Sequence, residues 1–106
     1  MEKDLEDQDF FEKMAISLNK IGGRDSRELI INILKRSITN EIAKQYGWAG
    51  KLKKMGFKDL LLAKCIMRAV RITDGTITEK EMIAYMSKWL VQATLRYTRS
   101  LEPKKT

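Results

Sequence analysis

The sequence predicts an all-α fold, a compact single domain of about five helices. Apolar residues recur at intervals of three and four along most of the chain, which is the spacing that gives a helix one buried face. The glycines and the single proline stand between these segments, where they mark the ends of helices. A chain of 106 residues, 43% of them hydrophobic, has enough apolar side chains for one core and no room for a second domain.

The first expected helix runs from about residue 5 to residue 21 and is acidic at its start. Residues 1–14 contain six acids against two lysines, a net charge of −4, so the rest of the chain carries +11 to give the total of +7. Gly22 and Gly23 end this helix. We therefore expect an acidic amphipathic helix in residues 1–22, a basic four-helix body in residues 24–100 and a frayed tail in residues 101–106. The inner stripe of the first helix consists of Phe11, Met14, Leu18 and Ile21.

Two helices are expected before residue 47. The second begins after Asp25, which can cap its free amides while Glu28 reaches back in a capping box. Its inner stripe consists of Leu29, Ile30, Ile33, Leu34 and Ile38. A short third helix begins after Thr39 or Asn40, ends near Tyr46, and carries Ile42, Ala43 and Tyr46 on one face.

Residues 47–58 contain three glycines and four lysines, and we expect them to form an ordered loop anchored by Trp48 and Phe57. A fourth helix over about residues 59–72 is apolar enough to be the most buried one. Its stripe consists of Leu62, Ala63, Ile66, Met67 and Val70.

The last helix, over about residues 79–99, has the clearest start. Thr78 and Glu81 fit a capping box, and Ile77 can pack on Met82 as a hydrophobic staple. The inward face consists of Met82, Ile83, Met86, Trp89, Leu90, Ala93 and Tyr97.

Residue types that carry catalysis are scarce. The chain has no histidine, and its one cysteine, Cys65, therefore lacks the imidazole partner of a nucleophile and the companions of a zinc site. Cys65 stands in an apolar run, which predicts a buried thiol in a reducing, intracellular compartment. No apolar stretch approaches the roughly 20 residues of a membrane helix. We expect a non-catalytic protein without cofactor, metal, membrane or small-molecule substrate.

Cations outside the apolar stripes form three groups. If they converge in the fold, they make a cradle for phosphates, and Gln92 with its neighbours Thr94 and Ser100 can hold phosphates or contact bases. A solvated polar face on each helix explains the same rows. The fourth helix carries Lys64, Arg68 and Arg71, the last helix carries Lys88, Gln92, Arg96 and Arg99, and the loop carries Lys51, Lys53, Lys54 and Lys58.

Protein docking or homodimerisation is the second hypothesis. The first helix is amphipathic and opposite in charge to the body, so it can fold back on its own domain or exchange with a second copy. The residues expected to mediate self-association are Phe10, Phe11 and Met14.

Residues 18–71 resemble an uncharacterised domain family common near the C-termini of invertebrate proteins, many of them transposon-related. The shared features are the IGG turn at 21–23, the pattern IxxxIAxxYGWxG at 38–50, and the phenylalanine and leucines that open the next helix. Trp48 and Gly50 are the most specific positions of this resemblance. The closing segment TEKEMIAYMSKWLVQATLRYTR also fits.

In its helix order and its arginine-bearing last helix, the pattern is similar to the BEN domain, an all-α module of chromatin and transcription factors. The resemblance implies a BEN-like helical arrangement, a nuclear location and DNA binding through the final helix and adjoining loops. The acidic first helix and Trp89 depart from a typical DNA reader and keep the protein-interaction hypothesis open. The residues implied to face DNA are Lys88, Gln92, Arg96 and Arg99, with Lys51, Lys53 and Lys54 on phosphates.

Overall fold

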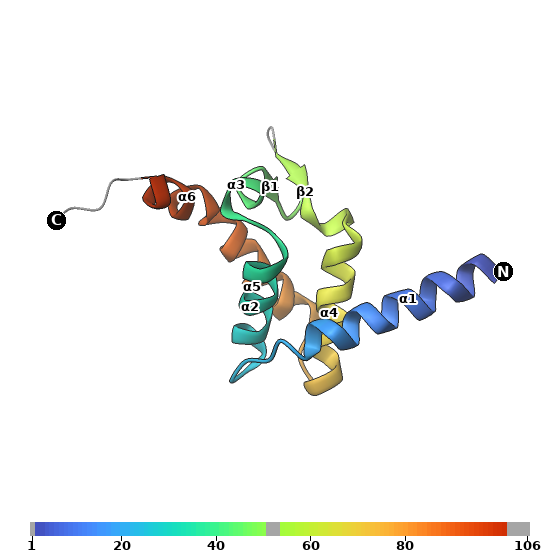
Figure 1. Ribbon diagram of the computed structural model, residues 1–106. Coiled ribbons are helices and arrows are strands. Elements are labelled where there is room, and N and C mark those ends of the chain that lie inside the picture. The colour runs from blue at the N-terminus through green and yellow to red at the C-terminus, as the bar shows by residue number, and fades with distance from the viewer. Residues whose placement is uncertain (1, 51–53, 102–106) are drawn as a thin grey trace.

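Helices dominate the computed structural model, which describes residues 2–50 and 54–101, with side chains from residue 8 onward (Figure 1). The prediction of a single all-α domain is confirmed. Lys51, Lys53 and residues 102–106 of the expected tail lie outside the described residues. In chain order the elements are α1 (Glu2–Asn19), α2 (Ser26–Ser37), α3 (Asn40–Ala43), β1 (Tyr46–Gly47), β2 (Met55–Gly56), the 3-10 helix η1 (Phe57–Asp59), α4 (Leu61–Thr73), α5 (Glu79–Val91) and α6 (Ala93–Leu101).

One hydrophobic core lies where α2, α4 and α5 meet. Each of these helices contributes a stripe of fully covered side chains, and burying one Leu or Ile contributes roughly 1.5–3 kcal/mol. Most of the stripes expected from the sequence are confirmed, including the burial of Met82 and Met86. The largest fully buried side chains are Phe57, Ile30, Ile33, Leu34, Ile66, Met82, Met86, Leu90, Val70 and Cys65.

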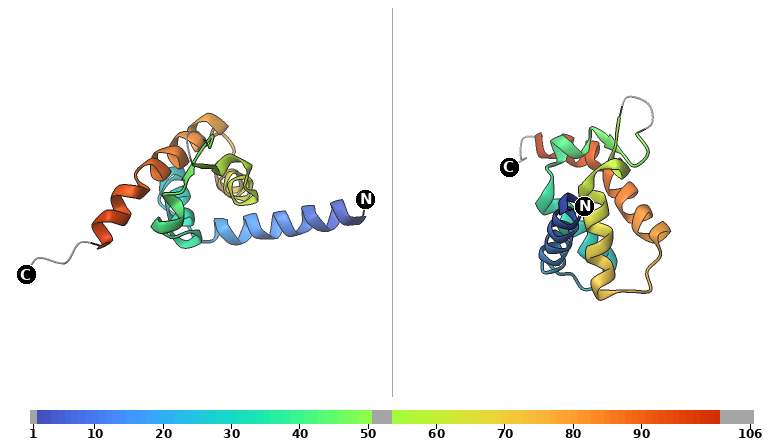
Figure 2. Two further views of the ribbon diagram at one scale, coloured as in Figure 1. Left: turned by 90° about the horizontal axis from the view of Figure 1, so that it is seen from above. Right: turned by 90° about the vertical axis from the view of Figure 1, so that its right-hand side faces the viewer.

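The helix α1 packs its C-terminal half along α4 and projects its first turns beyond the body (Figures 1 and 2). Ala15 and Leu18 are buried there, and Phe11 and Met14 pack against the core. The radius of gyration is 15.1 Å, larger than the roughly 13 Å of a compact domain of this length. The acidic helix therefore folds back on its own domain through one half only.

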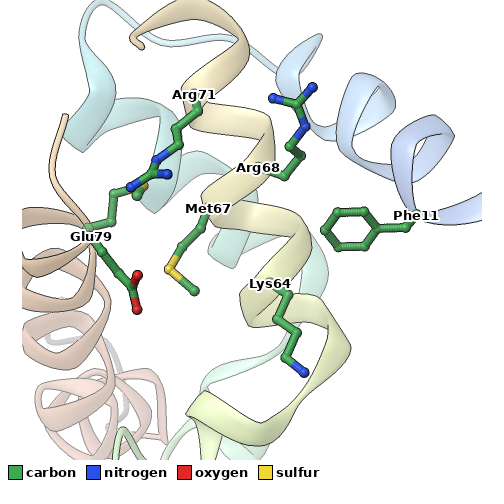
Figure 3. A pocket seen from close by; sticks show the side chains of 7 residues that line it. Phe11, Lys64, Met67, Arg68, Arg71 and Glu79 are labelled. Carbon is green, nitrogen blue, oxygen red and sulfur yellow. The ribbon is translucent and has the colours of Figure 1, made fainter. Parts of the chain in front are cut away.

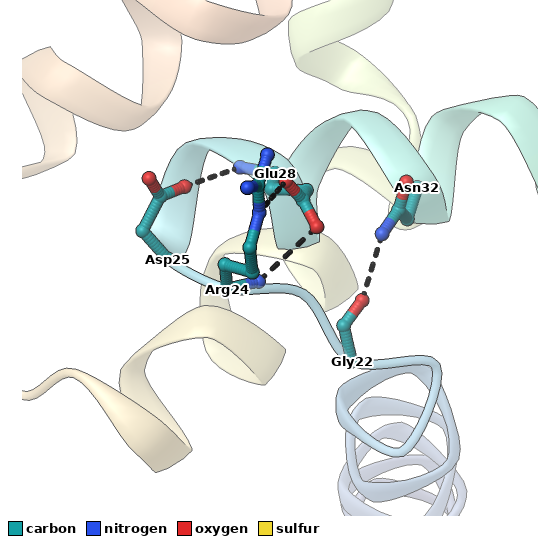
Figure 4. Close-up of polar contacts among 5 residues, drawn as sticks. All are labelled: Gly22, Arg24, Asp25, Glu28 and Asn32. Atoms are coloured by element: carbon teal, nitrogen blue, oxygen red, sulfur yellow. Dashed lines mark hydrogen bonds and ion pairs between the residues drawn. The ribbon is translucent and has the colours of Figure 1, made fainter.

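Of the two hydrogen bonds predicted for the capping box at the start of α2, the one accepted by Asp25 is present and the one accepted by Glu28 has a different donor (Figure 4). The Asp25 carboxylate accepts a hydrogen bond from the Glu28 backbone N–H at 2.8 Å. The Glu28 carboxylate bonds Arg24, not Asp25, accepting from its backbone N–H at 3.2 Å and from its Nε at 3.0 Å. The expected capping box is thus displaced by one residue. The Asn32 amide donates to the Gly22 carbonyl at 2.9 Å and ties the preceding turn to α2.

The segment expected as a loop contains two short parallel strands, with Tyr46 opposite Met55 and Gly47 opposite Gly56. Gly50 has a φ of +73°, and a Cβ there would lie 2.8 Å from the Gly56 backbone nitrogen, so the close approach needs glycine. Phe57 is fully buried and Trp48 packs beside it at a ring distance of 6.3 Å. The prediction that these two aromatics anchor the segment is confirmed.

Two expectations about helix faces and lengths are wrong. Ile42 is 45% exposed because α3 is one turn long and only Ala43 reaches the core. The last predicted helix is two helices, since Gln92 has a ψ of −3°, about 40° from the helical value. α5 ends at this break, and α6, which follows it, packs against α3.

Candidate nucleic-acid interface

The α4 cations line a hollow among α1, α4 and α5 (Figure 3). Lys64 and Arg71 are exposed at its rim, and Glu79 from α5 stands with them. Its apolar lining consists of Phe11, Met67 and Met82. The lining of this hollow therefore carries charges of both signs and is partly apolar.

Arg68, the middle cation of this row, is paired inside the chain. Its Nε donates to the Glu12 carboxylate at 2.7 Å and its Nη2 at 3.3 Å. The hydrogen bonds from Arg68 lower the pKa of Glu12, and the same contact raises the pKa of Arg68. The expectation that Lys64, Arg68 and Arg71 form a free row is corrected at Arg68.

Lys88 and Gln92 are exposed, and α5, which carries Lys88, packs against α2. They line a shallow hollow of about 50 Å³ with Arg27, a cation of α2. The remaining lining residues are Ile31, Tyr85 and Trp89.

Arg96 does not stand in an open row as expected. Its guanidinium lies 4.0 Å above the Trp89 ring, and its Nε donates to the Asn40 side-chain oxygen at 2.9 Å. Burial lowers the pKa of Arg96. The side chain is partly buried because the break at Gln92 brings α6 over α3. It lines a second hollow, of about 300 Å³, with Lys35, Ile38, Thr39, Asn40 and Trp89.

The two hollows share Trp89 as a wall and follow the junction of α2 with α5 and α6. We call this surface the α2–α5 seam and define it by Arg27, Lys35, Lys88, Gln92 and Arg96. Among the described residues that line it are four cations and no carboxylate.

Sequence reasoning predicted three of the five seam residues and missed Arg27 and Lys35. These two cations are eight residues apart on α2, or about 2.2 turns, so they lie within about 80° of each other around the helix. This spacing is the one feature of the sequence that could have identified these two residues. The sequence does not say that this side of α2 meets α5.

The remaining predicted DNA contacts are dispersed. Lys54 is half-buried and Lys58 exposed, and neither is among the residues that line the seam. Arg99 is exposed in the last turn of α6. The structure thus brings Lys88, Gln92 and Arg96 to one junction and leaves the α4 row in a separate hollow.

The residues expected to mediate self-association differ in exposure. Phe10 is 56% exposed, whereas Phe11 and Met14 pack partly against the core of their own chain. Of the three, Phe10 alone is exposed over most of its surface.

Three features of residues 2–50 and 54–101 concern the thiol, the potential metal ligands and the helix lengths. Cys65 is 2% exposed, and burial raises the pKa of its thiol. No group of three potential metal-ligating side chains gathers in this part of the chain. Within the same ranges, none of the helices combines the length and apolar character needed to cross a membrane.

Comparison of the chain with protein-family models, curated proteins and solved structures finds no match. The resemblance to the invertebrate domain family and to the BEN domain therefore stays a prediction from the sequence.

Proposed function

We propose that this domain is a non-catalytic recognition module that binds DNA through the α2–α5 seam, within a nuclear, chromatin-linked or transposon-derived protein. The observation that carries the proposal is the composition of the seam, whose described lining holds four cations and a glutamine without a carboxylate. Such a surface attracts phosphates and releases their counterions on binding.

The dimensions of the seam suit a nucleic-acid backbone. Arg27 and Lys35 stand about 12 Å apart along the axis of α2, which corresponds to about three to four nucleotides of one strand. Lys88 on α5 and Gln92 at its end line one hollow with Arg27. In this proposal the cations hold phosphates while the Gln92 amide is positioned for a base edge.

The test is fluorescence anisotropy of a labelled duplex with the wild-type chain and charge-reversal variants over a series of salt concentrations. We expect affinity to fall steeply with salt, and Arg27→Glu and Lys88→Glu each to weaken binding and lower the salt slope by about one. Lys64→Glu is the matched control, since it reverses one exposed charge in the α4 hollow. Failure to retain any duplex at low salt contradicts the proposal. Equal losses in all three variants contradict the assignment to the seam.

Self-association is the second candidate, and the projecting first turns of α1 favour it (Figure 2). The exposed Phe10 lies on this projection, and residues 1–14 are acidic. The α4 hollow offers an apolar floor with Lys64 and Arg71 beside it. In this scheme the acidic segment of one copy docks in the α4 hollow of another.

Light scattering over a wide concentration range tests this second candidate. It predicts a dimer that dissociates in Phe10→Ser and in Lys64→Glu. The control is Lys88→Glu, which changes an exposed cation outside the α4 hollow. A mass that stays monomeric at the highest concentration contradicts it.

A further inference from the structure

Two hydrogen-bond donors in the α2–α5 seam have no partner among the side chains and backbone that the structure describes. The Trp89 indole Nε1 and the Arg96 Nη2 are both covered by protein, and neither has an acceptor in this part of the chain. Folded proteins satisfy the great majority of buried polar groups, so a pair of unsatisfied donors needs an explanation. Trp89 as a whole is 6% exposed.

These donors belong to stacked side chains that line the same hollow. The Arg96 guanidinium lies 4.0 Å above the indole, and both residues line the hollow of about 300 Å³. Lys35 contributes a third donor group to this hollow, and Thr39 a hydroxyl. Every unsatisfied atom here is a donor, so the fitting ligand is rich in acceptors.

The charge of the hollow further limits which kind of ligand can bind there. Arg96 is partly buried and its Nη2 is covered, so part of its hydration is lost, which lowers its pKa. No carboxylate of the described residues pairs with it. A water molecule can accept the hydrogen bonds but leaves the guanidinium and Lys35 without a countercharge. An anion with several oxygens supplies both acceptors and charge.

We propose that this hollow is a binding site for one phosphate-type oxyanion, held by Arg96, Trp89 and Lys35. The identification of that anion as a backbone phosphate of DNA rests on the proposed function, whereas the site itself does not. Because both unpartnered donors are covered, binding includes a turn of the Arg96 side chain toward the hollow. Because the guanidinium is planar and rigid, this turn also breaks the hydrogen bond from its Nε to the Asn40 side-chain oxygen.

Nitrogen-15 NMR of the two indole N–H groups tests the site in the intact chain. Trp48 serves as an internal reference because it packs on Phe57 beside β1. Inorganic phosphate is titrated at constant ionic strength, balanced with chloride, and Trp48→Phe assigns the two signals. We expect a saturable shift of the Trp89 signal while the Trp48 signal stays in place.

Variants of two neighbouring α2 cations separate a built site from general charge. Lys35→Gln removes a lining cation and should weaken phosphate binding about tenfold, the loss of one charge-assisted contact. Arg36→Gln removes an exposed cation of the same turn that does not line the hollow, and should leave the affinity unchanged. Equal weakening in both variants, or no Trp89 shift in the wild type, overturns the site.

A labelled duplex added in a parallel titration distinguishes this inference from the proposed function. Duplex binding with no phosphate-induced shift overturns the oxyanion site and supports DNA binding elsewhere on the seam. A phosphate-induced shift without duplex binding supports the site and overturns the DNA proposal. Absence of both effects overturns both.

Discussion

The Glu12 carboxylate on α1 accepts two hydrogen bonds from the Arg68 guanidinium on α4, at 2.7 and 3.3 Å. This contact joins residues far apart in the sequence and uses the middle cation of the α4 row to hold the acidic helix. Near the end of α1, the Asn19 amide donates to the Ala69 carbonyl at 2.9 Å. The second half of α1 is thus attached to α4 by polar contacts as well as by packing.

The Glu12–Arg68 pair makes stability depend on pH. Because the contact lowers the pKa of Glu12 in the folded chain, the unfolded chain binds a proton first as the pH falls. The contribution of this pair to the free energy of unfolding is therefore fully present above the pKa of Glu12 in the unfolded chain. It declines from about pH 5 downward, through the pKa of Glu12 in the folded chain. We expect Glu12→Gln to flatten this decline without abolishing it, since the pKa values of Glu28 and Asp74 are also lowered. Urea midpoints measured over a pH series give the slope.

The reciprocal variant is the control for this assignment. Arg68→Gln removes the cation, so it should flatten the acid slope as much as Glu12→Gln does, and the double variant should add nothing further. Additive effects of the two changes would show that Glu12 owes its pH dependence to another group.

A pair of glycines should respond in opposite ways to one added methyl group. A Cβ at Gly23 would lie 2.6 Å from the Leu29 backbone nitrogen, a clash that only movement of α2 relieves, whereas nothing lies within 4 Å of a Cβ at Gly75. Gly23→Ala should therefore destabilise the fold by about 1–3 kcal/mol. Gly75→Ala should leave it unchanged or more stable by about 0.4–1 kcal/mol. Thermal unfolding of both variants checks the pair, and equal shifts would contradict it.

Local signals in the sequence were sufficient for most of the fold. Asp25, Thr39 and Thr78 each accept the backbone hydrogen bond expected of a helix cap. Caps and apolar stripes depend on residues three or four apart, so they are visible without knowledge of tertiary contacts. The break at Gln92 is not visible in this way, because it lets α6 follow α3, an element more than 45 residues earlier.

The candidate site was predicted less well, because the environment of a cation depends on the neighbouring helices. Arg68 and Arg96 both stand in regular polar rows, yet one pairs with Glu12 and the other stacks on Trp89. Arg27 and Lys35 were overlooked since only the apolar face of α2 has a distinctive pattern. Helical spacing identifies a face, whereas the packing of helices decides what that face meets.

The two phenylalanines Phe57 and Phe10 should differ sharply on truncation. Phe57 is fully buried between Tyr46 and Trp48. Its change to alanine should lower the free energy of unfolding by about 3–5 kcal/mol and remove the ring on which Trp48 packs. Phe10→Ala removes a side chain that is 56% exposed and should stay within about 0.5 kcal/mol of the wild type. Urea unfolding followed by tryptophan fluorescence measures both. A large loss in Phe10→Ala would indicate that this residue is covered in solution.

The Cys65 thiol should be nearly inert in the folded chain. It is 2% exposed in the middle of α4, and burial raises its pKa, so little thiolate forms and reagents reach it only when the core opens. We expect labelling by an aromatic disulfide reagent to be slow in buffer and fast in urea. Phe57→Ala should speed the labelling of the folded chain by about tenfold for each 1.4 kcal/mol of stability it removes, because opening then becomes more frequent. Equal labelling rates in buffer and in urea would place this thiol outside the core.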